Sequence, residues 1–250
     1  NGLKKNDTVN IATGKSHTLI ELVETISQVT ERIIPYEVNG KILAEVGKSR
    51  ISNRKLCEQY GFIPNDSLRE GLKKTAGRYK GKEVSTTPDS QELPKKKILL
   101  LGGEGFIGRN IAAHFASSAN CFSVGHYKSV FPNRSDTFVQ GNPYKNRIPN
   151  EYDVIIHLID NKVAPEEIAQ EETKLVQNLA IHPMNHLIIF SSAVTYVNPE
   201  SQYGQRKRAL ENFYKDFCEK NRIRLTIFRL FNVYGPFQIP FRQGSLVANL

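Results

Sequence analysis

The hydrophobic pattern of residues 96–250 consists of short apolar runs that alternate with longer polar or amphipathic segments. The four clearest runs are KILLLG (97–102), DVIIHLI (153–159), HLIIFSS (186–192) and RLTIFRLF (224–231). Continuous apolar runs of this length are typical of parallel strands that are buried on both faces. Their alternation with helical segments predicts an α/β fold with a parallel sheet.

Residues 1–80 carry a weaker pattern, which predicts two strands and at least two helices. The segment TVNIA (8–12) alternates apolar and polar residues like a short strand, and IPYEV (34–38) favours another strand. Two capping boxes mark helix starts, Thr18-x-x-Glu21 and Ser67-x-x-Glu70. Taken alone, these residues describe a small α/β piece without evident chemistry.

Composition narrows the class of protein further. With 39% hydrophobic and 24% charged residues, the chain has the make-up of an ordinary globular protein, and no apolar run is long enough to span a bilayer. The three cysteines, Cys57, Cys121 and Cys218, are widely spaced and match no metal-ligand pattern. This sparse, odd set predicts reduced thiols in a cytoplasmic protein.

The formal net charge of +9 raises the question of nucleic-acid binding. The basic residues are scattered, however, and the densest cluster, PKKK (94–97), is not interleaved with aromatic residues as a stacking surface would be. We therefore expect a solvated basic surface, whose field would also favour an anionic small ligand.

A glycine-rich turn follows the first apolar run. Gly102, Gly105 and Gly108 form G-x-x-G-x-x-G between a predicted strand and a predicted helix. Glycine permits a tight turn and close approach of the backbone to a pyrophosphate, and the N–H groups at the helix start attract an anion. The motif predicts a dinucleotide site.

A second group of residues could transfer protons. If residues 203–219 are helical, Tyr203 and Lys207 lie on one face, because they are spaced i and i+4. A phenol is a poor base at neutral pH, and a neighbouring ammonium favours the phenolate. Ser191 and Ser192 end a predicted strand, where a hydroxyl can face the ligand crevice. Together with the glycine turn, this set indicates an acid/base site rather than a surface tyrosine.

These segments resemble the extended short-chain dehydrogenase/reductase family, specifically its NAD-dependent epimerase/dehydratase group, which acts on nucleotide-sugars. The resemblance rests on GGEGFIG (102–108), DVIIHL (153–158), FSSAVTY (190–196), YGQRKRALE (203–211) and RLFNVYGP (229–236). It implies a Rossmann-type doubly wound parallel sheet over residues 96–250, with NAD or NADP as cofactor.

The resemblance also implies a role for individual residues. Ser192 would hydrogen-bond the C4 oxygen of the sugar, Tyr203 would be the acid/base, Lys207 would hold the nicotinamide ribose, and Asn232 would touch the nucleotide-sugar. The implied cofactor contacts are Gly102, Gly105, Phe106, Ile107, Gly108, Lys128, Asn142, Leu158, Tyr203 and Lys207. The implied partner is a nucleotide-sugar, with neither nucleic acid nor membrane, and a homodimer is left open.

Residues 8–80 resemble the C-terminal, substrate-lobe end of the same family. Residues 81–95 are polar, hold two prolines and lack periodicity, which is typical of a linker. The chain is therefore expected to contain the tail of one family unit (1–80), a linker (81–95) and the head of a second unit (96–250). A window within a longer tandem protein is the favoured explanation, and a circular permutation is the alternative.

Several positions depart from the family pattern. The segment NCFSVGHYKS (120–129) lacks the acid that would receive an adenosine ribose, and Lys128 with His126 could meet a 2′-phosphate instead, so NADP is slightly favoured. Asn142 stands where an aspartate is usual. The loop between Ser192 and Tyr203 is short and lacks the Asp-Glu pair of 4,6-dehydratases. AEVGKSRISNRKL (44–56) replaces the usual Arg-x-Gly-Asp region.

Two functional hypotheses follow. The first is an enzyme, an NAD(P)-dependent nucleotide-sugar 4-epimerase or 4-ketoreductase with a Ser-Tyr-Lys site, and the sequence does not separate these two activities. The second is a catalytically weak dinucleotide-binding scaffold or sensor, which the short loop and the altered second strand favour. Nucleic-acid binding rests on charge alone.

Overall fold

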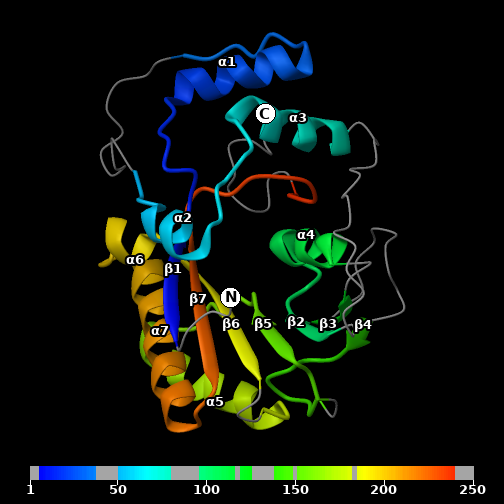
Figure 1. The fold of residues 1–250 in the computed structure, drawn as a ribbon, viewed down its shortest axis with the longest axis vertical. Helices are drawn as coiled ribbons and strands as arrows, with labels where there is room; N and C mark the ends of the chain where they lie inside the picture. Colours follow the sequence, from blue (N-terminus) through cyan, green and yellow to red (C-terminus); the bar gives the residue numbers. More distant parts are fainter. Residues whose placement is uncertain are drawn as a thin grey trace. The chain divides into compact units, whose positions relative to one another are not determined.

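The computed structural model describes residues 6–37, 50–79, 96–115, 119–125, 138–148, 151–181 and 185–239 (Figure 1). The chain divides into two compact units, which we describe separately. The sheet unit comprises Asn1–Asn10 and Thr86–Leu230, and the helical unit comprises Ile11–Ser85 and Phe231–Leu250.

The sheet unit is built around a seven-stranded sheet with the strand order β1-β7-β6-β5-β2-β3-β4. Its strands are β1 (Asp7–Ile11), β2 (Lys96–Leu101), β3 (Ala119–Gly125), β4 (Phe138–Gln140), β5 (Val154–His157), β6 (His186–Ser192) and β7 (Arg224–Leu230). Each pairing from β4 across to β7 is parallel. The parallel α/β sheet predicted from the apolar runs is therefore confirmed.

Helices cover both faces of this sheet. They are α4 (Phe106–His114), the 3-10 turn η2 (Pro165–Glu167), α5 (Ile168–Asn178), α6 (Val194–Val197) and α7 (Gln202–Lys220). Along β2, Leu99 and Leu101 join the core that α5 and α7 cover, while Ile98 and Leu100 pack toward α4. Because successive side chains of a strand point to opposite faces, one apolar run serves both cores, and the fold is doubly wound.

The strand β1 gives this sheet a member from the N-terminal part of the sequence. It lies next to β7, and the N–H of Leu225 in β7 donates to Asn6 Oδ1 at 3.0 Å. This grouping differs from the expected division into residues 1–80 and 96–250, because residues 6–10 belong to the same compact unit as β7. The pairing satisfies backbone groups of β7 that an open edge would expose. The expected linker, residues 81–95, lies outside the described residues.

The helical unit contains α1 (Leu19–Thr30), α2 (Arg54–Tyr60) and α3 (Leu68–Tyr79). Both predicted capping boxes are present. Thr18 and Glu21 bond each other's backbone N–H groups at the start of α1, and Ser67 and Glu70 do the same before α3. Each box satisfies N–H groups that a helix start leaves without an intrahelical partner. The strand predicted at residues 34–38 is wrong for its described part, residues 34–37, which form neither helix nor strand.

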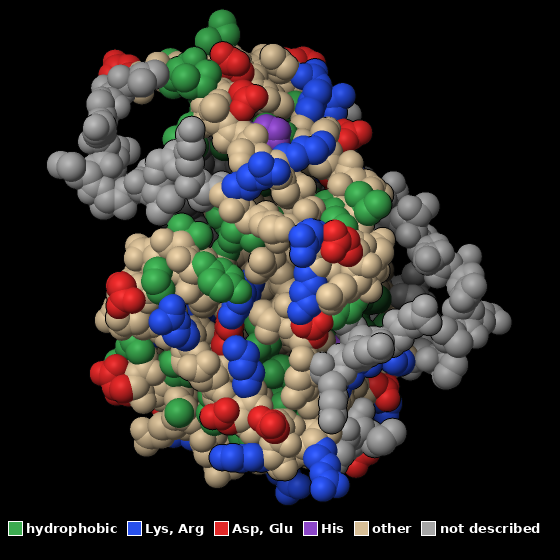
Figure 2. Space-filling model, turned by 60° about the vertical axis from the view of Figure 1, so that its left-hand side comes forward, with side chains coloured by type: hydrophobic (Ala, Val, Ile, Leu, Met, Phe, Trp, Pro, Cys, Tyr) green, Lys and Arg blue, Asp and Glu red, His purple; other side chains and the backbone are tan. Residues whose placement is uncertain are grey.

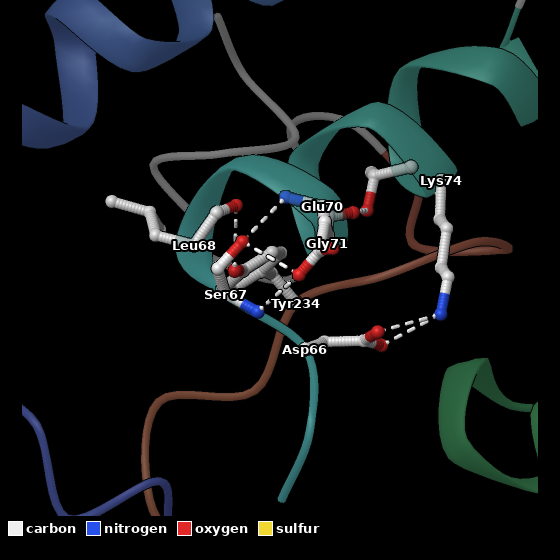
Figure 3. Close-up of polar contacts among 8 residues, drawn as sticks. Asp66, Ser67, Leu68, Glu70, Gly71, Lys74 and Tyr234 are labelled. Carbon is white, nitrogen blue, oxygen red and sulfur yellow. Dashed lines mark hydrogen bonds and ion pairs between the residues drawn. The ribbon is translucent and has the colours of Figure 1, made fainter.

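Residues 231–239 pack on α3 within the helical unit. Figure 3 shows Tyr234 beside the first turn of α3, where its hydroxyl donates to the Leu68 carbonyl at 3.4 Å. Lys74 in the same helix pairs with Asp66 at 2.7 Å. The Tyr79 hydroxyl donates to the carbonyl of Gln238. This unit thus combines segments from the two halves of the sequence.

Candidate functional site

The glycine-rich turn between β2 and α4 has a backbone that larger residues could not adopt. Gly102 has a φ of +82°, in the region that favours glycine. A Cβ on Gly108 would lie 2.4 Å from Gly103 Cα, so the helix start packs directly against the turn. Gly105 is the N-cap of α4 and offers no side-chain cap. The first N–H groups of α4, at Phe106, Ile107 and Gly108, therefore have no intrahelical partners.

This turn fits a dinucleotide. The nine-residue helix α4 begins at the carboxyl end of the buried strand β2, where open α/β sheets bind their ligands. A pyrophosphate placed there would meet uncapped N–H groups and the positive end of the helix dipole. The predicted cofactor role of Gly102, Gly105 and Gly108 is consistent with this geometry.

The loop after β5 lies against the glycine turn. A Cβ on Gly102 would meet the Ile159 side chain at 3.2 Å and the Ile159 backbone nitrogen at 3.4 Å. The N–H of Leu158 donates to the Leu101 carbonyl at 2.9 Å. Leu158, a predicted cofactor contact, is therefore held at the same edge of the sheet as the glycine turn.

A buried polar network fixes this loop from within the core. His157, at the end of β5, accepts a hydrogen bond at Nδ1 from the N–H of Ile159 at 3.2 Å, which leaves Nε2 to donate to Glu172 at 2.9 Å. The hydroxyls of Tyr214 and Tyr144 also donate to the Glu172 carboxylate, at 2.6 and 3.1 Å. Burial alone would raise the pKa of Glu172, but His157 and the two tyrosines lower it overall. Both oxygens of this buried carboxylate therefore have hydrogen-bond partners, as a buried charge requires.

The two serines at the end of β6 face opposite sides of the sheet. Ser191 is buried, whereas Ser192 is half-buried. Ser192 Oγ accepts from the N–H of Val194 at 3.2 Å, at the start of α6. Of the pair, Ser192 is the residue with access to solvent, as its predicted role requires.

Tyr203 and Lys207 project from the first two turns of α7. This helix begins at Ser201, whose hydroxyl accepts from the N–H of Gly204 at 3.0 Å. A Cβ on Gly204 would lie 2.5 Å from the Asn198 carbonyl oxygen, so glycine allows the short loop to pass close to the helix. The Lys207 ammonium lies 5.5 Å from the centre of the Tyr203 ring. The predicted i, i+4 arrangement is present.

Lys207 connects this pair to the loop after β5. Its ammonium lies 3.0 Å from Asp160 Oδ1, and its side chain is only 8% exposed. Since β5 pairs with β2, the contact places Lys207 at the carboxyl edge of the sheet, close to the strand that leads into the glycine turn. The loop therefore contacts both parts of the candidate site.

Of the remaining predicted site residues, the structure describes two, Asn142 and Asn232, and not Lys128. Asn142 follows β4 and closes a turn, because its Oδ1 accepts from the N–H of Tyr144 at 2.9 Å. It also lines a hollow of about 330 Å³ that includes Asp160. Lys128 lies outside the described residues. Asn232 belongs to the helical unit, where it is exposed with a φ of +38° that asparagine tolerates.

The structure also informs the alternatives raised by composition. On the face drawn in Figure 2, basic and acidic side chains are interspersed rather than gathered into one basic surface. The three cysteines are free thiols, and burial raises the pKa of Cys218 to about 12. The described residues contain no His, Cys, Asp and Glu group suited to a metal ion, and no described helix could cross a membrane.

Two features of the site were not predicted from the sequence, namely Asp160 and the network around His157 and Glu172. The available signal was the segment HLID (157–160), where a histidine and an aspartate follow a buried strand directly. Glu172 gave no signal, because an acidic residue in an amphipathic helix ordinarily faces solvent.

A glycine-rich turn after β2, in a doubly wound parallel sheet, is typical of dinucleotide-binding proteins. Residues 98–250 match the family described as the NAD dependent epimerase/dehydratase family. The chain belongs to this family, which confirms the resemblance noted in the sequence.

Individual relatives are distant. The chain is 28% identical over 158 residues to a UDP-2-acetamido-2,6-beta-L-arabino-hexul-4-ose reductase of Pseudomonas aeruginosa, which aligns 61% of this chain and 39% of the relative. It is 24% identical over 175 residues to a UDP-glucose 4-epimerase of Lactobacillus helveticus, covering 56% of this chain and 52% of the relative. The chain thus spans about two fifths and one half of these two relatives.

The fold resembles that of a solved family structure. A UDP-N-acetylglucosamine 4-epimerase from Methanobrevibacter ruminantium M1, in complex with UDP-N-acetylmuramic acid, superposes with a TM-score of 0.50 at 22% identity. The match covers 61% of this chain and 60% of the other. It confirms the Rossmann-type fold.

Proposed function

We propose that the protein is an NAD(P)-dependent nucleotide-sugar epimerase or reductase that acts at C4 through Ser192, Tyr203 and Lys207. One observation carries the proposal. The loop after β5 touches the glycine turn through Ile159 and holds Lys207 through Asp160, so the dinucleotide turn and the acid/base pair share one edge of the sheet. Relatives described as a 4-epimerase and a hexul-4-ose reductase support the same chemistry.

Each residue has a separate task in this proposal. A bound nicotinamide supplies or accepts the hydride at C4. Tyr203 moves the proton of the C4 oxygen. The residue is 39% exposed, so a substrate can reach its hydroxyl. Lys207 donates to the nicotinamide ribose and favours the phenolate form of Tyr203 after proton transfer. Ser192 hydrogen-bonds the C4 oxygen, and Asn232 contacts the nucleotide-sugar.

The acid/base role is tested by substitution. Tyr203→Phe keeps the ring packing and removes the proton-transferring oxygen, so we expect turnover to fall by ~10²-fold or more while cofactor binding stays intact. Lys207→Met should weaken cofactor binding as well, and Ser192→Ala should reduce turnover less. Single-turnover hydride transfer, followed at the nicotinamide absorbance, measures all three. If Tyr203→Phe retains more than half the rate, the scaffold hypothesis takes the lead.

For the cofactor we propose NADP over NAD. No acid stands at the end of β3, where Val124 and Gly125 are its last residues, so a ribose 2′-hydroxyl lacks its usual acceptor. Lys128 and His126 follow in the sequence and could meet a 2′-phosphate. Calorimetric titration with both cofactors tests this, and at least tenfold tighter binding of NAD(H) overturns it. Cofactor released on denaturation separates the activities, since an epimerase retains NAD and a reductase exchanges its cofactor.

The homodimer that the resemblance left open is also a proposal. A groove of about 400 Å³ runs between α5 and α7 in the sheet unit, lined partly by Ala169, Ala209, Phe213 and Phe217. The rings of Phe213 and Phe217 stack at 6.0 Å. Analytical ultracentrifugation of the unaltered protein and of Phe213→Glu tests whether this face joins two copies. The proposal is overturned if the two proteins sediment with the same mass.

A further inference from the structure

Asp160 makes a contact that the proposed chemistry does not require. Its carboxylate pairs with Lys207 at 3.0 Å, although Lys207 already has two expected partners, the phenol and the nicotinamide ribose. The two side chains differ in exposure, at 41% for Asp160 and 8% for Lys207. The partner of a nearly buried ammonium is energetically significant, because water replaces it only poorly.

The position of Asp160 is built into the fold. The loop that carries it is tied to β2 by the N–H of Leu158 and to the core by His157, whose ring accepts from the N–H of Ile159. The His157 ring is held in turn by the buried Glu172. The backbone that carries Asp160 is therefore held from the core, although the carboxylate itself is exposed.

The charge balance around Tyr203 follows from this contact. Two charged groups are seen against this pair, namely Asp160, which pairs with Lys207, and Arg206, whose guanidinium lies 5.7 Å from the Tyr203 ring centre. Two other cations have partners elsewhere, because Arg208 donates to the Thr195 carbonyl, and Arg229 pairs with the Glu211 carboxylate and stacks over Tyr196.

A carboxylate beside the ammonium offsets its charge, and so weakens the stabilisation that the ammonium gives to a phenolate. We propose that Asp160 is a positioning residue, which holds the Lys207 ammonium in place beside the Tyr203 ring and offsets its charge there. This inference rests on the proposed function.

The proposal is tested by titrating Tyr203 directly in the full chain. Phenolate absorbance is followed from about pH 6 to about pH 11, and the curve of the matching Tyr203→Phe protein is subtracted, so that only Tyr203 contributes. In Asp160→Asn we expect the phenol of Tyr203 to ionise at a lower pH, because an anion has been removed beside the pair. Asp160→Glu, which restores the carboxylate, should return the curve toward that of the unaltered protein. A curve of Asp160→Asn that coincides with the unaltered one overturns the proposal.

The controls separate this inference from the proposed function. Glu219→Gln removes an exposed carboxylate from the last turn of α7, far along the helix from Tyr203, and should leave the curve unchanged. Asp160→Ala serves as a second variant with the same expected direction, and circular dichroism checks that each variant is folded. If the unaltered protein binds neither NAD nor NADP, the proposed function fails, whereas the titration still decides whether Asp160 controls the ionisation of Tyr203.

Discussion

Different interactions stabilise the interior of the sheet unit and the interior of the helical unit. In the sheet unit, continuous apolar strands are buried between two helical layers, and backbone approaches backbone at Gly103 and Gly108. In the helical unit, capping boxes, the Asp66–Lys74 ion pair and tyrosine hydroxyls make many of the described contacts. The residues proposed for acid/base chemistry, Tyr203 and Lys207, lie in the closely packed sheet unit, as a site with closely held geometry requires.

The largest expected difference between the units comes from two matched glycine substitutions. Gly108→Ala places a Cβ 2.4 Å from the backbone of Gly103, which cannot move aside as a side chain can. We expect a loss of about 3 kcal/mol or more in unfolding free energy, or failure to fold. In α3 a Cβ on Gly77 meets nothing within 4 Å, so Gly77→Ala should be neutral or stabilise by up to about 1 kcal/mol. Chemical denaturation measures both, and similar costs for the two variants would contradict the comparison.

A smaller effect is expected from pH, and it should be confined to the sheet unit. His186 in β6 bonds Thr226 of β7 at 2.8 Å, and burial, with Arg224 and Lys96 nearby, lowers the pKa of His186 from 6.5 to about 4. Since the folded state binds the proton less readily than the unfolded state, stability is present above about pH 6.5 and is lost as the pH falls toward 4. We expect a loss of about 1–3 kcal/mol over that range, which is discounted for the partial exposure of the ring.

His186→Gln is the matched variant for this prediction. It removes the titrating ring while keeping a polar side chain beside Thr226, so its stability should depend less on pH between 6.5 and 4. Denaturation at a series of pH values compares the two proteins. An equally steep dependence in both would mean that other groups dominate the acid sensitivity of the sheet.

The smallest effect concerns the contact between Tyr234 and α3. A Cβ on Gly71 would lie 2.8 Å from the Tyr234 hydroxyl, but a side chain can yield where backbone cannot. Figure 3 shows Gly71 and Tyr234 next to each other. We expect Gly71→Ala to cost about 1 kcal/mol in the unaltered protein. In the Tyr234→Phe background the blocking oxygen is absent, and the same substitution should cost little or nothing. A double-mutant cycle by denaturation measures the coupling, and additive effects would show that the two residues do not press on each other.

Much of the architecture could be predicted from the sequence, because the strongest signals are local. The apolar runs identified β2, β5, β6 and β7, and the capping boxes located α1 and α3, since strand burial and helix capping depend on nearby residues. The strand prediction at residues 34–37 was wrong because a strand depends on more than its own residues. Apolar, β-favouring residues form a strand only where another strand can pair with them.

The sequence by itself determined the family, the glycine turn and the spacing of Tyr203 and Lys207, because each is encoded within a few consecutive residues. Only the tertiary structure decided which serine of the pair is accessible, that β1 lies beside β7, and that Asp160 pairs with Lys207. These last relations join residues that are far apart in the chain. They depend on strand order and on the side to which each strand turns a given residue, which no local pattern specifies.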